Sequence, residues 1–490
     1  MWIFAALWMG AGGAQAQLVS SAARLTLVPQ HTDLLPGSRP DVKGWLGMTG
    51  MSGLAFRLDN SLLQPQGLFT PGPMGGATLQ LSNLISQLSN ENAVGVQHAQ
   101  ELVSFGFSGG ELGESLWSFR IRERAEARFN LPGDLLLMPF TGNAPGSRLN
   151  FSDLSARAIH FREYSAGWNR KWSDHFQSGV RLNYLYGMEY AELSNFSATW
   201  LTDETDFSYT LQASGVLQTS GLSTLDQTST DLESYLLYRD NRGWSVDLGG
   251  QWHGEEGLMF GGHVLDLGSI HWTEDIETSS LESAYFQYAG PEISGDVLLD
   301  VFSGDSLSNW LEAQVGELDT LFAPVVSEAS FQAALPARVV LEAGFDVLER
   351  AKSRGRFHAM AVGSLDANQV NQWNFSLAYN HRWGRNAELA IAWNQFPSGF
   401  GALGGAFSLN LGPLQWYLAA DNLLLGAWTE YTLDEDVFAV PDRIDVISIH
   451  TGFNLAFGRG GGKPEKRDKP TESSAGRKGV PCENFLASSR

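Results

Sequence analysis

The chain has 490 residues, with 54 acidic against 32 basic side chains and a formal net charge of -22. Apolar residues make up 43%, aromatic residues 11% and charged residues only 18%, whereas about 25% charged residues is usual in soluble globular proteins. Such a chain is too apolar to be disordered, and its acidity argues against a nucleic-acid partner. Its single cysteine, Cys482, excludes an internal disulfide framework and a cysteine-based zinc site.

The chain begins with a short apolar run that is typical of a secretory signal peptide. The run covers residues 2–14 and ends in Ala14-Gln15-Ala16, the small-residue pattern of a signal-peptidase site. We therefore predict a signal peptide over residues 1–16 and a mature chain from about Gln17. No basic residue precedes Arg24, so a start further upstream and a buried N-terminal strand or helix are kept as alternatives.

Residues 17–90 carry mixed patterns instead of a regular strand repeat. Leu79 to Leu88 has the apolar spacing of a short helix, and we interpret the whole N-terminal segment as a candidate plug. Two later stretches also have helical character: Pro132 to Met138, as a single turn, and Asp305 to Leu321, as an amphipathic helix with Asp305 at its N-cap. Ordinary loop structure is the alternative for these pieces.

Residues 91–458 are dominated by alternation of apolar and polar side chains. In Trp373 to Trp383, one face reads Trp, Phe, Leu, Tyr, His, Trp and the other Asn, Ser, Ala, Asn, Arg. Strands of ~9–11 residues with one apolar side and aromatic ends are those that cross membranes in β-barrels. The pattern recurs in residues 180–186, 244–252, 339–347, 407–411, 414–418 and 447–457.

The alternation predicts an all-β fold, a transmembrane antiparallel β-barrel of about 14 to 16 strands with a few short helices. A soluble β-sandwich also alternates, but its strands are usually ~5–6 residues long and its exposed face is charged. No later segment offers the ~20 apolar residues of a membrane helix. We expect residues 444–458 to form the closing strand, paired with the first barrel strand. Residues 459–490 hold eight basic and four acidic residues and are predicted to be a disordered tail.

Four arginines share one face of a predicted strand, together with Ser118 and Glu126: Arg120, Arg122, Arg124 and Arg128. Arginines that face lipid would be very costly. We therefore expect this face to point into the lumen, where acidic residues of other strands can pair with it. A stripe that attracts anions is the functional alternative.

One region gathers histidines and carboxylates of the kinds that bind metal ions: His253, Glu255, Glu256, His263, Asp266 and His271. His263 and His271 are expected on one strand face, about 26 Å apart, which is too far for one ion. Glu255 and Glu256 lie between glycines and predict a hairpin turn. The region therefore predicts no metal site.

Two other patterns suggest chemistry only weakly. Asp247-Leu248-Gly249 and Asp266-Leu267-Gly268 repeat on neighbouring strands, and we expect polar lumen groups that meet across strands, with a paired acid function as the alternative. Ser448 and His450 share a face of the last strand but lack a context that would activate a nucleophile. We expect no catalytic, cofactor-binding or metal-binding residues and no cofactor, and the sequence identifies no ligand-binding residues.

Six stretches together resemble a known family: Arg162 to Trp168, Gly179 to Gly187, Asn241 to Gly249, Leu265 to Trp272, Leu409 to Tyr417 and Gly452 to Gly458. In this order, from about Gly44 to Gly458, the chain resembles a Bacteroidota family of outer-membrane barrels known only as a domain of unknown function. The resemblance implies an architecture related to fatty-acid-type transporters and to barrel subunits of type IX secretion. It implies no enzyme activity.

The leading functional hypothesis is an outer-membrane barrel that binds or passes a small hydrophobic molecule. The alternative is a non-conducting structural or docking barrel of a surface secretion or adhesion assembly. The expected partners are outer-membrane lipid and, during biogenesis, the barrel-assembly machinery. The alternative adds a secretion or surface partner, and no nucleic acid is expected.

Overall fold

A computed structural model of the chain describes residues 24–62, 64, 67–71, 77–88, 91–110, 114–222, 240–288, 322–350, 353–365, 373–396, 401–422, 428–433, 436–441 and 444–458. The predicted signal peptide, the predicted helix from Asp305 to Leu321 and the predicted tail with Cys482 lie outside these residues.

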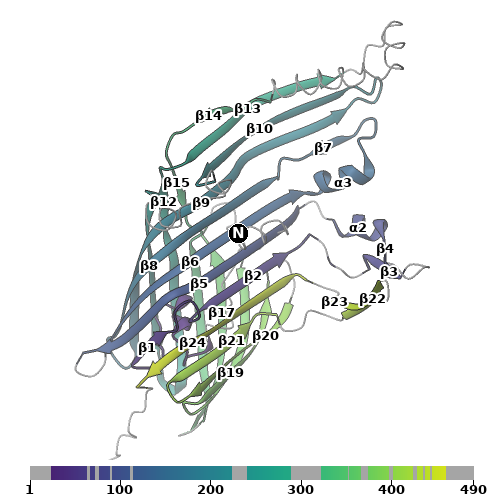
Figure 1. Ribbon diagram of the computed structural model, residues 1–490. Coiled ribbons are helices and arrows are strands. Elements are labelled where there is room, and N and C mark those ends of the chain that lie inside the picture. Colours follow the sequence, from purple (N-terminus) through teal and green to yellow (C-terminus); the bar gives the residue numbers. More distant parts are fainter. Residues whose placement is uncertain are drawn as a thin grey trace, which may run out of the picture.

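The strands close into an antiparallel β-barrel (Figure 1). Among the described residues its wall has fourteen strand positions, of which the first is shared by β1 (Gly44–Gly47) and β2 (Leu54–Asn60). The others follow in chain order around the wall: β5 (Glu91–Gly109), β6 (Ser115–Pro132), β8 (Ser155–Lys171), β9 (Phe176–Thr202), β11 (Arg242–His253), β12 (Leu258–Trp272), β16 (Arg338–Arg350), β17 (Ser353–Ser364), β18 (Trp373–Trp383), β19 (Ala387–Gln395), β20 (Gly401–Leu411), β21 (Leu414–Ala420) and β24 (Val446–Phe457).

This architecture confirms the predicted fold class. β18 has the bounds that its alternation predicts. β24 pairs with both β1 and β2, so the final strand closes the ring as expected. Closure pairs the strands at both edges, which removes the unsatisfied backbone groups that lipid would not tolerate.

One side of the wall is taller than the other (Figure 1). The 27-residue strand β9 pairs with β11 in its first half and with β10 (Tyr209–Ser220) in its second half. Beyond β10 the extension continues with β13 (Ile276–Tyr288) and β14 (Val325–Ser327). Two short strands, β7 (Arg148–Asn150) and β15 (Phe331–Ala334), pair with β9 and β12.

Short helices and two small hairpins complete the described fold. The helices are η2 (Pro29–Asp33), α2 (Leu81–Gln87), α3 (Gly133–Thr141) and η4 (Glu255–Gly257), and the hairpins are β3 (Phe69–Pro71) with β4 (Ala77–Leu79) and β22 (Trp428–Leu433) with β23 (Asp436–Pro441). The predicted helices near residues 79–88 and 132–138 are confirmed as α2 and α3. Among the described helices, none has the length and apolar character needed to span a membrane.

The two ends of the barrel differ in their connections. At the turn end the strands are joined by short turns, such as residues 172–175, 254–257, 384–386 and 412–413. At the loop end the connections are longer, such as residues 61–90 and 133–154. Membrane barrels typically have short turns on one side and long loops on the other.

The distribution of polarity is inverted relative to a soluble protein. Outward side chains are apolar and exposed, for example Trp244 at 64% and Leu377 at 65%. Inward side chains are polar and buried, for example Glu163, Asn183 and Gln415, each at 0%. An apolar outer band around a polar interior is the pattern of a transmembrane β-barrel.

A bulge in β12 changes which residues point inward. Asp266 has a positive φ of 58°, and the register with β11 shifts between Val246 and Leu248. An extra residue in one strand reverses the alternation beyond it. His263 is therefore buried, whereas His271 is exposed, and the prediction that these two histidines share one face is wrong.

Candidate functional site in the barrel lumen

Residues 24–43, here called the luminal segment, fill the turn-end half of the lumen before the chain enters β1. Leu25, Leu27 and Val28 are completely buried, and Leu34 and Leu35 are 2% and 3% exposed. Two apolar clusters anchor the segment to two parts of the wall. Leu25 and Val28 pack with alanines and Tyr417 of β19 to β21, and Leu34 and Leu35 pack with apolar side chains of β12, β16 and β17.

Polar contacts hold the luminal segment between these apolar anchors. The carboxylate of Glu388 on β19 accepts hydrogen bonds from the backbone amides of Thr26 at 3.1 Å and Leu27 at 3.0 Å. Asn454 on β24 donates to Gln30 at 2.9 Å. Beyond its continuity with β1, the segment is therefore held to the wall strands by non-covalent contacts among the described residues.

Two glycines let the segment approach the wall closely. A Cβ added to Gly37 would lie 2.4 Å from the backbone nitrogen of Gly250 on β11. A Cβ added to Gly179 on β9 would lie 2.1 Å from the carbonyl oxygen of Pro36. Any larger residue at either position would push the segment away from the wall.

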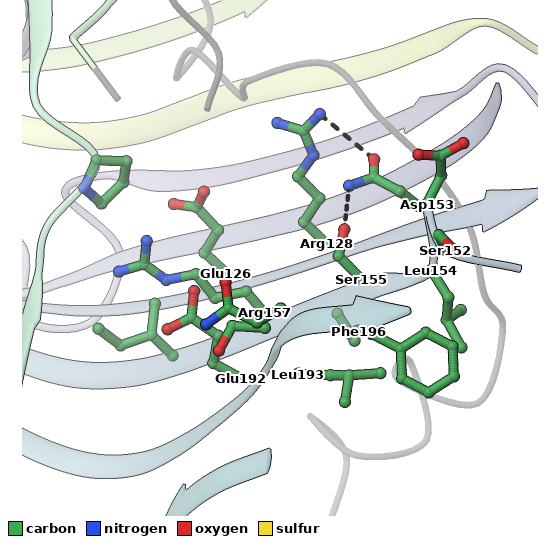
Figure 2. Close-up of a pocket in the computed structure, with 16 residues that line it drawn as sticks. Glu126, Arg128, Ser152, Asp153, Leu154, Ser155, Arg157, Glu192, Leu193 and Phe196 are labelled. Carbon is green, nitrogen blue, oxygen red and sulfur yellow. Dashed lines mark hydrogen bonds between the residues drawn. The ribbon is translucent and has the colours of Figure 1, made fainter. Parts of the chain in front are cut away.

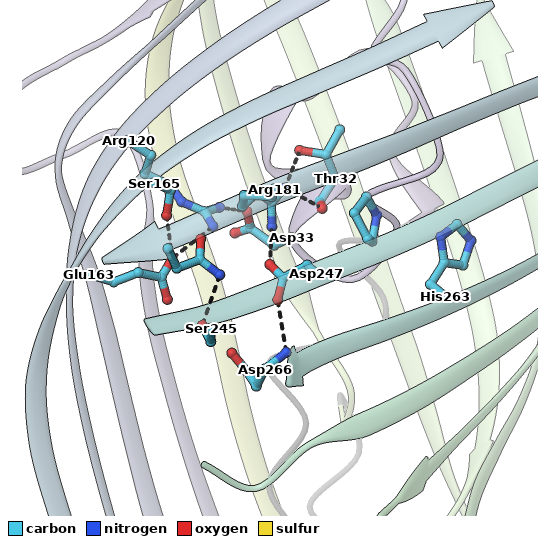
Figure 3. A network of polar contacts seen from close by, with 12 residues as sticks. Thr32, Asp33, Arg120, Glu163, Ser165, Arg181, Ser245, Asp247, His263 and Asp266 are labelled. Atoms are coloured by element: carbon cyan, nitrogen blue, oxygen red, sulfur yellow. Dashed lines mark hydrogen bonds and ion pairs between the residues drawn. The ribbon is translucent and has the colours of Figure 1, made fainter. Parts of the chain in front are cut away.

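The arginine stripe, defined as Arg120, Arg122, Arg124 and Arg128 of β6, meets the luminal segment at Asp33 (Figure 3). Arg120 forms a short ion pair with Asp33, and Arg122 Nη1 lies 3.5 Å from the other carboxylate oxygen. Arg181 on β9 donates to the carbonyl oxygen of the neighbouring Thr32 at 2.8 Å. Asp33 thus lies among three buried guanidinium groups.

Acidic residues of the wall pair with the same arginines. Glu163 on β8 lies 3.1 Å from both Arg120 and Arg122 and 3.3 Å from Arg124. Asp266 lies 2.6 Å from Arg124 and also pairs with Arg338 on β16. The prediction that the arginines face the lumen and pair with acids of other strands is confirmed.

The two Asp-Leu-Gly repeats also meet across strands, as predicted. The backbone amide of Asp266 donates to Asp247 Oδ1 at 2.8 Å, and Asp247 Oδ2 lies 3.1 Å from Arg181. Both aspartates are bound to arginines, so they form part of a charge network.

Burial and charge shift the pKa values of the luminal segment. Burial alone would raise the pKa of Asp33, but Arg120, Arg122 and Arg181 outweigh it and hold that pKa below its ordinary value. Burial lowers the pKa of His31, although its contact with the carbonyl oxygen of Val28 opposes the shift. The segment therefore carries an ionised Asp33 and a neutral His31 at pH 7.

The loop-end half of the lumen contains a cavity of about 400 Å³, here called the outer pocket (Figure 2). Its charged lining comprises two arginines, Arg128 and Arg157, and three carboxylates, Glu126, Asp153 and Glu192, and Arg128 donates to Asn130 at 3.4 Å. Its apolar lining includes Leu154, Ile159, Leu193 and Phe196. The arginine stripe therefore runs from the luminal segment to the outer pocket.

An aromatic cluster lies beside the upper part of the stripe. The ring centroid of Tyr190 lies 5.2 Å from that of Trp272 and 5.4 Å from that of Phe331. Trp272 is completely buried, and a Cβ added to Gly187 would lie 2.8 Å from its ring. A packed apolar cluster therefore lies next to the charged side chains of the lumen.

A second cavity of about 260 Å³, here called the inner pocket, lies between the luminal segment and the turn end. Glu342 on β16 binds His263 and His358 there, each at 2.8 Å. Asp41 of the luminal segment pairs with Arg382 at 2.5 Å. The inner pocket is lined mainly by such charged pairs.

The candidate metal residues do not converge. His263 binds Glu342, His271 is exposed, and Glu255 and Glu256 form the predicted turn as part of η4. Within the described ranges, no group of three or more His, Cys, Asp or Glu side chains could hold a metal ion.

Ser448 and His450 contact different partners, and another Ser–His pair is in contact. Ser448 Oγ accepts the amide of Asp421 at 2.9 Å, whereas His450 contacts the Tyr417 hydroxyl at 2.9 Å. On the outer face, Ser353 Oγ lies 3.0 Å from His381 Nε2, and Tyr379 Oη lies 3.0 Å from His381 Nδ1. The sequence analysis missed this pair because the two residues lie on different strands.

The luminal segment is the main feature of the site that side-chain patterns alone could not locate. It was expected only as part of a broad N-terminal segment, residues 17–90. Leu25 and Val28 have the i, i+3 spacing of a helix but form only one such pair, and Leu34 and Leu35 are adjacent, so neither pair predicts a regular element. The burial of the polar residues between them, such as Gln30 and His31, is seen only in the structure.

Comparison with solved structures finds other membrane barrels at very low identity. The Ralstonia pickettii toluene transporter TbuX is 10% identical, with 88% of this chain and 94% of that chain covered and a TM-score of 0.35. A Pseudomonas aeruginosa FadL homologue is 9% identical, with 91% and 100% covered and a TM-score of 0.41. The P. putida toluene transporter TodX is 8% identical, with 90% and 94% covered and a TM-score of 0.34.

No curated protein matches the chain. A family description does match, over residues 36–421, which include most of the barrel and the last eight residues of the luminal segment. The sequence resemblance to a domain of unknown function is thereby confirmed at the level of the family. The chain belongs to the family of unknown function DUF5723.

Proposed function

We propose that this protein is a gated barrel of the bacterial outer membrane that passes a small, largely hydrophobic molecule. The observation that carries the proposal is the luminal segment. It fills one half of the lumen through non-covalent contacts, while an outer pocket of about 400 Å³ stays open in the other half. A lumen that is closed by a separable piece of its own chain suits regulated passage.

The width of the barrel supports this proposal. Barrels of about eight strands are filled by their own side chains, whereas those of 16–18 strands leave a water-filled channel. A wall of fourteen strands lies between these cases, so its lumen has room for an added segment or a small molecule. The apolar lining of the outer pocket, Leu154, Ile159, Leu193 and Phe196, would contact the hydrophobic part of that molecule.

The apolar outer band and the short turns support a place in the bacterial outer membrane, with the loop end outside and the turn end in the periplasm. In that setting the partners are outer-membrane lipid and the barrel-assembly machinery. The signal peptide and a Bacteroidota origin stay predictions from the sequence.

Uptake by whole cells tests the proposal. A Gram-negative host without its own hydrophobic-uptake barrels would produce the full chain, a variant without residues 24–33, or a control variant without residues 463–490. We expect labelled aromatic hydrocarbons or medium-chain acids to enter faster than in cells without the chain, and fastest with residues 24–33 removed. The control deletion should behave as the full chain.

Uptake equal to that of cells without the chain, for every solute and for both the full chain and the opened variant, would contradict the proposal. If a stoichiometric partner then co-purified with the barrel, the docking function would be favoured in its place.

A further inference from the structure

The buried charge network takes one of its carboxylates from the luminal segment. Among the described residues its arginines include Arg120, Arg122, Arg124, Arg181 and Arg338. The wall strands supply the carboxylates Glu101, Glu126, Glu163, Asp247 and Asp266. Arg120 and Arg122 form ion pairs with Glu163 of the wall and with Asp33 of the luminal segment, so displacement of the segment would remove one of these two partners.

Removal of one carboxylate from a buried cluster of arginines is unfavourable. If the luminal segment is displaced, Glu163 still contacts Arg120 and Arg122, and an anionic group of a ligand would restore the partner that Asp33 provides. Guanidinium groups bind carboxylates through two parallel hydrogen bonds. A ligand carboxylate would therefore match the site that Asp33 now occupies.

We infer that Arg120, Arg122 and Arg181 form the binding site for the carboxylate of the transported molecule, and that Asp33 is an internal substitute for it. This inference rests on the proposed function and deepens it, because it makes the molecule a small amphipathic acid. Its apolar part would be accommodated by the apolar lining of the lumen.

The position of the arginine stripe supports this route. Arg128 lines the outer pocket together with the carboxylates Glu126, Asp153 and Glu192, and Arg120 and Arg122 hold Asp33. Alternate residues of a strand share one face and are about 6.6 Å apart. Below Glu126, an acid on its way to Asp33 would meet the guanidinium groups of Arg124, Arg122 and Arg120.

Ligand and luminal segment would compete for this site. The cavity beside Asp33 has a volume of only about 20 Å³ and is lined by Ser118, Ser165 and Arg181. This space holds about one water molecule and no alkyl chain. Binding of the acid therefore requires the segment to leave.

Calorimetry on the full chain in detergent tests the site, with octanoate as the acid and 1-octanol as the matched neutral probe. Asp33→Asn removes the competing charge and should strengthen octanoate binding about tenfold, whereas Arg122→Gln should weaken it about tenfold. Both substitutions break the same ion pair, so a purely structural role would shift them in the same direction. Asp41→Asn, which affects only the inner pocket, is the control and should leave the affinity unchanged.

A second measurement leaves the charge network intact. In a Cys482→Ser background, Val28→Cys places a thiol on the buried luminal segment. Octanoate should displace the segment and accelerate the reaction of this thiol with a maleimide at least about threefold. 1-Octanol should leave the rate of this reaction unchanged.

Equal binding of octanoate and octanol, or equal shifts in Asp33→Asn and Arg122→Gln, would overturn the inference. Uptake of neutral solutes without octanoate binding would reject the carboxylate site but not the passage function. Octanoate binding without uptake of any solute would reject the passage function but not the site.

Discussion

The backbone amide of Asp266 donates a hydrogen bond of 2.8 Å to the carboxylate of Asp247 on the neighbouring strand. This contact stabilises the bulge that turns both Leu265 and Asp266 into the lumen. It also directs the carboxylate of Asp266 to Arg124 and Arg338. A single irregular residue in the wall thus positions the acid that pairs with the upper part of the arginine stripe.

Asp247→Ala should destabilise the folded barrel by about 3 kcal/mol or more, because it leaves Arg181 without its wall carboxylate and the Asp266 amide without its acceptor. Asp247→Asn keeps an acceptor for the amide and should cost about half as much. Urea unfolding, followed by the heat-modifiable band on gels, measures both. Asp174→Asn is the control, because Asp174 pairs with Lys171 in an exposed turn. Equal urea midpoints for Asp174→Asn and Asp247→Ala would refute the role of the bulge.

Leu377→Arg should impair membrane assembly. Leu377 lies in the middle of β18 with its side chain 65% exposed on the outer face, and an arginine facing lipid near the bilayer midplane costs ~2–4 kcal/mol. Leu377→Phe, which lipid accommodates, should assemble normally. The folded fraction in membranes reports the difference, and normal assembly of both variants would contradict the assignment of this face to lipid.

Glu388→Ala should loosen the luminal segment while the barrel itself stays folded. Glu388 accepts the backbone amides of Thr26 and Leu27, and each buried amide that loses its acceptor costs about 1–3 kcal/mol. In the Val28→Cys, Cys482→Ser background, maleimide labelling should become faster while the folded band persists. Leu389→Ala, on the outer face of the same strand, serves as the control. No change in labelling with Glu388→Ala would mean that other contacts hold the segment.

Mild acid should also loosen the luminal segment, through His31. Burial lowers the pKa of this histidine below its ordinary value of 6.5, so the seated segment binds fewer protons than the released one. Its stabilisation is therefore complete above pH 6.5 and is lost as the pH falls below that value. The pKa of Asp33 lies below its ordinary value of 3.8, so Asp33 stays ionised and contributes no change between pH 7.5 and 5.5.

The rate of maleimide labelling of Val28→Cys, divided by the thiolate fraction at each pH, should accordingly rise as the pH falls from 7.5 to 5.5. His31→Gln should reduce this rise. His263, which accepts the amide of Gly37 at 3.2 Å, faces the same segment, so the difference between the two variants isolates the part due to His31. Identical pH profiles of the labelling rate with and without His31 would refute the role of His31 in this loosening.

The strands of the wall could be predicted from the sequence because the residues of each strand show the pattern by themselves. Alternation is a local property, and lipid on one side enforces it, so β18 could be assigned residue by residue. The inward direction of Arg120 to Arg128 followed from the cost of charge in lipid. The bulge at Asp266 was not predictable, because it depends on an acceptor from β11 and a positive φ that Asp rarely adopts.

The lumen was harder to predict because its contacts are distant in sequence. Arg124 and Asp266 are separated by 142 positions, and no local pattern indicates which of many acids pairs with which arginine. The place of Asp33 depends on the path of a segment with no regular repeat. Its partners became identifiable only once the wall had fixed the positions of Arg120, Arg122 and Arg181.

The hydrogen bond between Gln30 and Asn454 joins residues 424 positions apart, and it has a consequence for the order of folding. The luminal segment precedes every barrel strand in the chain, yet one of its binding partners lies on the last strand. Contacts between such distant residues form late because of their entropic cost. The luminal segment is thus seated last, after β24 has joined β1. Until then it is accessible to proteases, and cleavage within residues 24–43 would mark chains whose barrels have not yet closed.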